Sequence, residues 1–115
     1  MADESCLFCR IVSGEIPSEQ VGEDDLTLAF RDVNPQAPTH VLVIPKAHSP
    51  TLPELAESDP DAALAVLAMA RRVAEEAGIG AGYRLVANNG AGAQQTVFHA
   101  HVHVIGGREL TWPPG

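Results

Sequence analysis

Histidine alternates with a small apolar residue in the segment His99-Ala100-His101-Val102-His103-Val104-Ile105. Strict alternation is the period of a β-strand, in which every second side chain points to the same face. The segment therefore predicts a strand over 99–105 with the three imidazoles on one face, about 6.6 Å between neighbours. The opposite face is small and apolar, so it can pack against a helix. The chain must then contain a sheet with one apolar side and one ionisable side.

Local patterns predict the other elements. Asp59 is suited to cap a long helix that begins at Pro60 and ends before Gly78. Helical spacing gives this helix an apolar face made of Ala63, Val66, Leu67, Ala70, Val73, Ala74 and Ala77. The remaining predictions are a short N-terminal helix over 6–12 ended by Gly14, strands over 26–30, 40–44 and 83–87, and a hairpin-type turn at Asn88-Asn89-Gly90.

These elements combine into an α+β fold. We expect a mainly antiparallel sheet of about five strands with the helices on one face. No repeat, linker or low-complexity run divides residues 1–115, so they are expected to form a single domain. The C-terminal residues from about 108 to 115 include Trp112-Pro113-Pro114-Gly115 and are expected to be an extended tail.

The charge of the chain excludes several classes of partner. Fifteen acidic and seven basic side chains give a net charge of −8, and the basic ones are scattered. Nucleic acids and anionic membranes attract basic clusters, so neither is an expected partner, whereas a nucleotide is compatible with the charge. The longest apolar stretch, Ala62 to Ala70, is about half a membrane span. The acidic start, Met1 to Glu4, is unlike a signal peptide, so a cytoplasmic location is expected.

The histidine segment has three possible interpretations. The imidazoles could be core side chains, but six ring nitrogens would then need buried partners. They could share one metal ion with a further ligand. They could also form a nucleophilic site, in which the central imidazole attacks and its neighbours control tautomer and charge. The glycine-bearing loop 88–96 favours the third interpretation, because its backbone N–H groups and the side chains of Gln95 and Thr96 can face an anion.

The two cysteines, Cys6 and Cys9, form a C-x-x-C pair. A structural disulfide is not expected in the cytoplasm, and the βαβ context of a thioredoxin-like redox pair is absent. Two buried, unused thiols are one alternative. A zinc site is the leading interpretation, because the pair supplies half of a Cys2His2 tetrahedron.

The histidine segment resembles the His-φ-His-φ-His-φ-φ signature of the histidine-triad (HIT) superfamily. The resemblance to its Hint branch, the purine nucleoside phosphoramidases, runs nearly end to end and includes a bacterial-type C-x-x-C. The similar segments are Phe8 to Pro17, Asp24-Asp25, Ala29 to Asp32, Pro35 to His40, Val43 to Lys46, Gly82 to Arg84, the loop 88–96, Gly106 to Arg108 and the tail from Trp112. The resemblance implies a HIT-like fold.

The resemblance also implies an activity. The enzyme would be a hydrolase that cleaves the P–N bond of AMP-type or GMP-type phosphoramidates through a nucleotidyl-histidine on His101. His40 would orient His101, while His99 and His103 would support the strand and contact phosphate. Thr96, which stands where Hint proteins usually carry Ser, would interact with the leaving group. No metal would be required for this chemistry.

Further site residues follow from the same resemblance. The nucleotide-binding set would be Phe8, Ile11, Ile16, Phe30 and Val33 around the base, Asp32 at the ribose, and Asn88, Gln95, Thr96, His101 and His103 at the phosphate side. Arg31 replaces a frequent His, which leaves base preference open. Structural Zn²⁺ would be bound by Cys6, Cys9, His48 and His99. The chain would form a homodimer in which the Trp112 tail approaches the partner's active site.

Other functions stay open on the sequence. Relatives in the same superfamily cleave dinucleoside polyphosphates or transfer nucleotidyl groups. A non-catalytic nucleotide-binding or zinc-binding interaction module is a different class, and a metalloprotein with all three histidines on one ion is another. The metalloprotein would lose its metal when His101 or His103 is replaced, whereas the Hint-like site would not.

Overall fold

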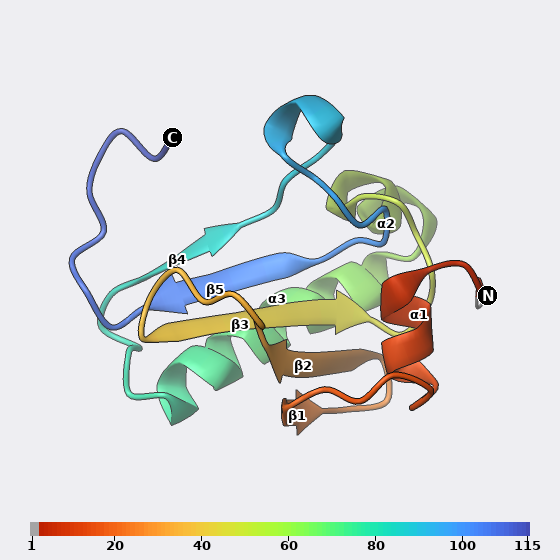
Figure 1. The fold of residues 1–115 in the computed structure, drawn as a ribbon, viewed down its shortest axis with the longest axis horizontal. Helices are drawn as coiled ribbons and strands as arrows, with labels where there is room; N and C mark the ends of the chain where they lie inside the picture. Colours follow the sequence, from red (N-terminus) through yellow and green to blue (C-terminus); the bar gives the residue numbers. More distant parts are fainter. Residues whose placement is uncertain (1–2) are drawn as a thin grey trace.

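A five-stranded sheet organises the computed structural model, which describes residues 3–115. The sheet has the order β1-β2-β3-β5-β4, and every neighbouring pair is antiparallel (Figure 1). This architecture confirms the predicted α+β class. The elements are α1 Leu7–Val12, β1 Gln20–Glu23, β2 Thr27–Arg31, β3 Thr39–Pro45, α2 Leu52–Ser58, α3 Pro60–Glu76, β4 Tyr83–Val86, the 3-10 helix Ala91–Ala93 and β5 Val102–Gly106.

Helix α3 covers one face of the sheet. Asp59 caps it as predicted, since its carboxylate accepts a hydrogen bond from the backbone N–H of Ala62 at 3.2 Å. The buried residues of α3 pack on the inward side chains of the strands, which are Ala29, Val41, Val43, Val102 and Val104. The small side chains of the histidine segment therefore face a helix, as expected.

The apolar face predicted for α3 is partly wrong. Leu67 is 45% exposed and Ala77 is also exposed, whereas Met69 is 2% exposed and belongs to the core. Alanine and leucine occur on several sides of this helix, so its periodicity permits more than one apolar stripe. Contact with the sheet selects the stripe that contains Ala62, Ala63, Val66, Met69, Ala70, Val73 and Ala74.

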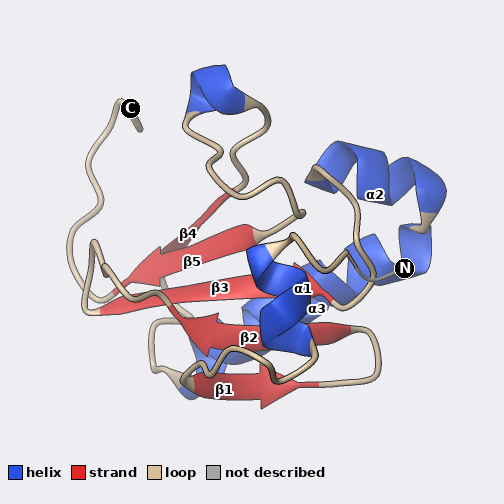
Figure 2. Ribbon diagram, turned by 45° about the vertical axis from the view of Figure 1, so that its right-hand side comes forward, coloured by secondary structure: helices blue, strands red, loops and turns tan. Residues whose placement is uncertain are grey.

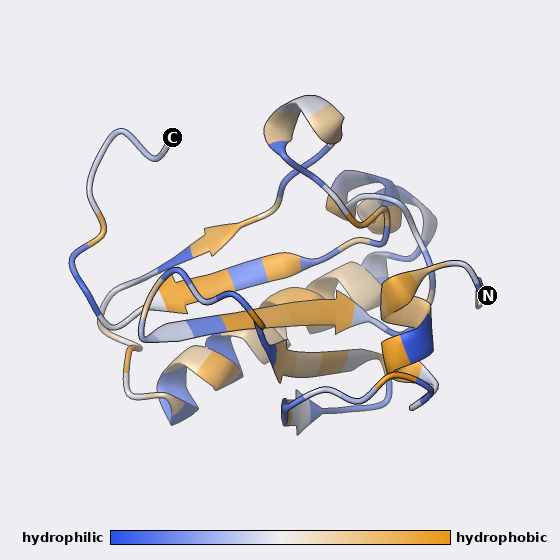
Figure 3. Ribbon diagram, viewed as in Figure 1, coloured by the Kyte–Doolittle hydropathy of each residue, from blue (hydrophilic) through white to orange (hydrophobic). Residues whose placement is uncertain are grey.

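The prediction that the helices lie on one face is also wrong. Helix α1 packs on the opposite side of the sheet from α3 (Figure 2). Phe8 and Ile11 of α1 form a second apolar cluster with Leu28 and Phe30 of β2 and with Leu42 and Ile44 of β3. Figure 3 shows that β3 is mostly hydrophobic, whereas a hydrophilic band crosses β5. The second face therefore changes from apolar under α1 to polar along β5.

The last strand is shorter than predicted, because β5 begins at Val102 rather than at His99. Val43 pairs with Val102, so a continued register would place Pro45 opposite Ala100. Proline has no N–H to donate, and the ladder ends there. The N–H of Ala100 donates instead to the carbonyl of Ser49 at 2.6 Å. Residues 99–101 are consequently positioned by contacts outside the sheet.

Local patterns missed or misplaced three other segments. Strand β1 and helix α2 were not predicted; Thr51 caps α2, and Pro53 lies in its first turn. The turn at Asn88-Asn89-Gly90 does not close a tight hairpin, since residues 87–101 connect β4 to β5 and include a 3-10 turn. The tail beyond Gly107 has no regular structure, as expected. Among residues 3–115, no helix combines the length and hydropathy needed to cross a membrane.

Candidate active site and metal centre

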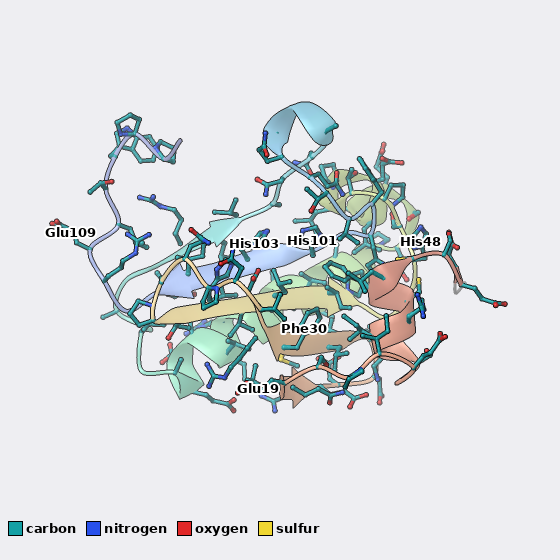
Figure 4. All side chains as sticks on the ribbon, in the orientation of Figure 1. Glu19, Phe30, His48, His101, His103 and Glu109 are labelled. Atoms are coloured by element: carbon teal, nitrogen blue, oxygen red, sulfur yellow. The ribbon has the colours of Figure 1, made fainter. Side chains whose placement is uncertain are left out.

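His101 and His103 lie next to each other at the start of β5, on the face opposite α3 (Figure 4). Their ring centroids are 5.2 Å apart, and the ring planes are inclined by 66°. His101 is 7% exposed, so its side chain is almost completely enclosed by its neighbours. The two imidazoles therefore form one continuous polar patch.

The tautomer of His101 follows from its hydrogen bond. Its Nδ1 lies 2.7 Å from the carbonyl oxygen of His99. A carbonyl can only accept, so Nδ1 carries the proton and donates. In the neutral ring Nε2 is then unprotonated and has a free lone pair. This is the form of imidazole that can act as a nucleophile.

His40 and His103 form a second hydrogen-bonded pair with defined tautomers. The backbone N–H of Gln36 donates to Nδ1 of His40 at 3.0 Å, so Nε2 of His40 carries the ring proton. That proton is donated to Nδ1 of His103 at 2.9 Å. The N–H of His103 must therefore be on Nε2. His103 consequently offers a donor at its outer nitrogen, and His101 offers a lone pair.

Burial favours the neutral form of His103. Desolvation, together with smaller contributions from the neighbouring His101 and His40, lowers the pKa of His103 to about 4, while Asp32 acts in the opposite direction. His103 is therefore uncharged at physiological pH. Its role as a donor rests on its tautomer rather than on a positive charge.

Asp32 places a carboxylate beside the histidine pair. One oxygen, Oδ2, is 3.4 Å from Nε2 of His40, and the other accepts a hydrogen bond from the N–H of Asn34 at 2.8 Å. The side chain is 18% exposed, so it can still accept hydrogen bonds from a bound molecule. This geometry suits the hydroxyl groups of a sugar.

The four residues predicted to bind metal converge in the structure. Nδ1 of His99 lies 3.4 Å from Sγ of Cys6, 3.5 Å from Sγ of Cys9 and 3.2 Å from Nδ1 of His48. Sγ of Cys9 is 3.3 Å from Nδ1 of His48. Tetrahedral zinc with sulfur and nitrogen ligands has ligand separations of about 3.3–3.8 Å. The cluster could therefore hold a metal ion, and its separations fit a tetrahedral one.

The residues around the cluster also keep its donor atoms in forms that can bind a metal. Nε2 of His99 donates to the carbonyl of Pro45 at 2.8 Å, so Nδ1 is unprotonated and faces the other three donors. Burial lowers the pKa of His99 to about 4, which keeps the ring neutral. Burial also raises the pKa of the Cys9 thiol, contrary to what an activated redox cysteine requires.

The three histidines of the 99–103 segment do not share one site. Within residues 3–115, the donor atoms that converge form two groups, one with His99 and one that combines His103 with Asp32 and His40. His101 instead donates its Nδ1 proton to a carbonyl. The geometry therefore disfavours the metalloprotein with all three imidazoles on one ion.

The residues predicted around a nucleobase are only partly together. Phe8, Ile11 and Phe30 are buried in the cluster under α1, and Ile16 packs against it. Phe8 contacts His101 edge to face, with centroids 5.1 Å apart. Val33, in contrast, is fully exposed. The apolar cluster therefore adjoins the histidines, and Val33 projects away from the packed residues.

The loop before the histidines is held by one buried amide. Oε1 of Gln95 accepts from the N–H of Gly90 at 2.8 Å, and Nε2 donates to the carbonyls of Pro50 and Val97 at 2.7 and 3.1 Å. Gln95 is 3% exposed, so its side chain shapes the loop. Thr96 is exposed and Asn88 is half-buried. These two side chains, together with the half-buried His103, are accessible polar groups of the predicted phosphate side.

Sequence reasoning missed the main-chain groups of the site. The carbonyls of His99, Pro45 and Ser49 and the N–H of Gln36 set ring tautomers or the path of the chain. Every residue carries such groups, so no residue type marks them. Among these residues, only Pro45 has a type that indicates its role locally, because proline cannot donate to a β-ladder and β3 ends there.

Comparison with known proteins identifies the family. The model of the HIT domain matches residues 13–110. The "Adenylylsulfatase HINT1" of Arabidopsis thaliana is 45% identical over 116 residues, which cover 99% of this chain and 79% of that protein. The "14 kDa zinc-binding protein" of Zea mays is 45% identical over 115 residues, which cover 98% and 90% of the two chains.

A solved structure gives the same result. The crystal structure of a HIT family hydrolase from Legionella pneumophila superposes with a TM-score of 0.91 at 49% sequence identity, covering 96% of this chain and 99% of that chain. The family match spans the β-sheet and the histidine segment, and the fold agrees over nearly the whole length. The chain therefore belongs to the histidine-triad (HIT) family.

Proposed function

We propose that this protein is a nucleotide hydrolase that cleaves the P–N bond of purine nucleoside 5′-phosphoramidates through a covalent intermediate on His101. The observation that supports it best is the hydrogen bond between Nδ1 of His101 and the carbonyl of His99 at 2.7 Å. That bond leaves the lone pair of Nε2 free to attack phosphorus. The names of the Legionella and Arabidopsis relatives, a hydrolase and an adenylylsulfatase, are consistent with this proposal.

The first step is the attack of Nε2 of His101 on the α-phosphorus. A P–N bond to His101 forms while the bond to the leaving amine breaks. The amine must leave with a proton, which is taken up from solvent water, because an amide anion is a very poor leaving group. The exposed hydroxyl of Thr96 is our candidate for a hydrogen bond to that nitrogen. His103 donates from Nε2 to a phosphate oxygen, which offsets the charge that develops there.

The second step is hydrolysis of the intermediate. Water attacks phosphorus and loses a proton to the solvent, the bond to Nε2 of His101 breaks, and the nucleoside monophosphate leaves. His40 keeps His103 in the tautomer that donates toward phosphate, through the 2.9 Å hydrogen bond between them. His40 and His99 therefore support the reaction without contacting the reacting atoms, while His101 returns to its neutral form.

Nucleotide binding is assigned to the groups around this centre. Asp32 would accept from the ribose hydroxyls, and the cluster of Phe8, Ile11, Ile16 and Phe30 would flank the base with Val33 at its exposed margin. Asn88 would contact the phosphate side, and Gln95 would hold the loop that carries Thr96. A homodimer, a purine nucleotide as ligand and a cytoplasmic location complete the proposal.

We assign zinc to the Cys6, Cys9, His48 and His99 cluster, because its donor set and separations fit a tetrahedral site. A relative from Zea mays is named as a zinc-binding protein, which is consistent with this assignment. The ion would join α1 to two later segments of the chain and supply no reacting group. His101 and His103 stay available for the nucleotide.

A second substrate should also be tested, because the Arabidopsis relative is named as an adenylylsulfatase. Adenosine 5′-phosphosulfate has the same adenylyl group, so attack by His101 would give the same intermediate. Sulfate is a far better leaving group than an amine and needs no proton. Loss of the Thr96 hydroxyl would therefore slow phosphoramidate cleavage more than phosphosulfate cleavage.

The deciding experiment measures AMP release from adenosine 5′-phosphoramidate and from adenosine 5′-phosphosulfate. The purified wild type should turn over at least one of them without added metal, and His101→Ala should lose activity by a factor of about 10³ or more. If the wild type binds AMP and cleaves neither compound, the protein is a nucleotide-binding module and the enzyme proposal is wrong.

A further inference from the structure

His99 participates in both the metal cluster and the proposed nucleophilic site. Its Nδ1 faces Cys6, Cys9 and His48, while its backbone carbonyl accepts the Nδ1 proton of His101 at 2.7 Å. The residue is completely buried. A rotation of the His99 side chain or main chain would therefore alter the metal cluster and the proposed nucleophilic site together.

The segment that carries His101 is not fixed by the sheet. The ladder of β5 begins at Val102, so His99, Ala100 and His101 depend on other contacts. These are the hydrogen bonds from Nε2 of His99 to Pro45 and from the N–H of Ala100 to Ser49, 2.8 and 2.6 Å long, and the approach of His99 to His48. Two of the three partners belong to the metal-binding segment or directly follow it.

Phe8 provides a second link between the two sites. It lies between Cys6 and Cys9 on α1 and is 5% exposed. Its ring stands edge to face against His101, with centroids 5.1 Å apart and an angle of 87°. It also contacts His99 at a centroid distance of 5.9 Å. A change in the position of the two cysteines would therefore move a ring that packs on His101.

We propose that the metal cluster sets the orientation of His101, with His99 and Phe8 as positioning residues that transmit the constraint. The nucleophile is held by the His99 carbonyl on its Nδ1 edge and by Phe8 against its ring. Both residues belong to or adjoin the ligand set that joins α1 to the segment before β5. This inference rests on the proposed nucleophilic role of His101 and extends it.

The inference predicts a particular kinetic defect. Asp32 directly follows β2, His40 lies on β3 and His103 lies on β5; Nε2 of His40 approaches both of the others, outside the metal cluster. Substrate binding at those groups should survive loss of the metal. The attack step should not, because an imidazole that is displaced by about 1 Å can lose about a hundredfold in rate. The expected result is a lower kcat with little change in KM.

The test compares His48→Ala with Leu7→Ala in the full chain. His48 contacts Cys9 and His99 within the cluster, whereas Leu7 lies on α1 with 43% exposure. The measurements are bound Zn²⁺ per chain, kcat and KM for adenosine 5′-phosphoramidate, and the ¹⁵N signals of the His101 ring. We expect His48→Ala to lose Zn²⁺, to reduce kcat about tenfold to a hundredfold, and to show a mixture of His101 tautomers. Leu7→Ala should match the wild type in all three.

A metal-free His48→Ala with wild-type kcat and an unchanged His101 tautomer would overturn the inference. If this variant does not fold, the wild type is treated with a chelator and titrated with Zn²⁺ alone. The His101 signals must then change with Zn²⁺ occupancy, and constant signals would equally refute the coupling. The NMR measurement does not require turnover, so a wild type without activity would reject the proposed function and leave the coupling separately testable.

Discussion

At the scale of single residues, the environment of each histidine selects its tautomer. The N–H of Gln36 can only donate, so His40 presents its own proton to His103. A carbonyl can only accept, so His101 exposes a lone pair. Side chains of identical composition thus offer a donor in His103 and a lone pair in His101 through the neighbours they contact.

The first residue-scale prediction tests whether the backbone N–H of Gln36, and not its side chain, fixes the tautomers of His40 and His103. His40→Asn should lower kcat by about tenfold or more, because His103 then loses the donor that fixes its tautomer. Gln36→Ala keeps the backbone N–H and removes only the side-chain hydrogen bond to the carbonyl of Asn34, which is 2.9 Å long. It should retain wild-type kcat in the same assay. Equal losses in both variants would contradict the tautomer argument.

The second residue-scale prediction concerns pH and stability. The folded-state pKa of His103 is lowered to about 4 from an ordinary value of 6.5. Above pH 6.5 the residue is neutral in both states. Between pH 6.5 and 4 the unfolded chain binds a proton that the folded chain does not, so the free energy of unfolding falls as the pH falls.

His103→Gln removes this contribution, because glutamine does not titrate. The decrease in Tm between pH 7 and pH 4.5 should therefore be smaller in the variant, by about 4 °C or more for each kcal/mol removed. Thermal unfolding followed by circular dichroism at both pH values measures it. A parallel decrease in the two proteins would show that His103 titrates normally in the folded state.

At the scale of elements, the end of β5 is closely packed. A Cβ added to Gly106 would lie 2.6 Å from Cδ1 and 3.3 Å from Cβ of Ile79, and 3.4 Å from Cβ of Tyr83. Gly82, in the segment before β4, has open space around the same position. The two glycines therefore form a matched pair for measuring the cost of a methyl group.

We expect Gly106→Ala to lower the free energy of unfolding by about 1–3 kcal/mol, because overpacking forces a shift of Ile79 or of the strand. Gly82→Ala should change it by less than about 0.5 kcal/mol or stabilise slightly. Urea unfolding of both variants gives the comparison. Equal stability would mean that Ile79 moves without cost and that the strand end is loosely packed.

At the scale of the whole molecule, the exposed apolar side chains are the candidates for the contact in the expected homodimer. Leu64 and Leu67 are 67% and 45% exposed on α3, and Leu85 is 40% exposed on β4, which is an edge strand. Edge strands and exposed apolar residues are common at contacts between copies of a chain. These features favour association through α3 and through the edge strand β4.

The corresponding prediction is a sedimentation mass of about twice the 12.1 kDa of one chain. Leu67→Asp should shift the mass toward that of a single chain, because an unpaired carboxylate would be buried in the contact. Leu26→Asp is the control, since Leu26 is 42% exposed near the β1–β2 connection. A wild type that sediments as a single chain would reject the homodimer.

The local sequence was sufficient for the elements with strong local signals. The cap at Asp59, the apolar run of β3 and the alternation from Val102 onward act between neighbouring residues, so short-range rules describe them. The residue types also indicated both a nucleophilic imidazole and a Cys2His2 metal site. The family resemblance supplied the particular ligands, and the structure brings all four together.

Tertiary structure decided what depends on distant partners. His99 meets Cys6 across 93 positions and Pro45 across 54, and the carbonyl of Pro45 fixes its tautomer. The sheet likewise selects which stripe of α3 is buried, placing Met69 inside and Leu67 outside. Hydrogen bonds to main-chain groups have no residue-type signature, because every residue carries the same backbone. The sequence therefore determined which reactive groups the protein possesses, and only the folded chain determined which nitrogen of each ring is available.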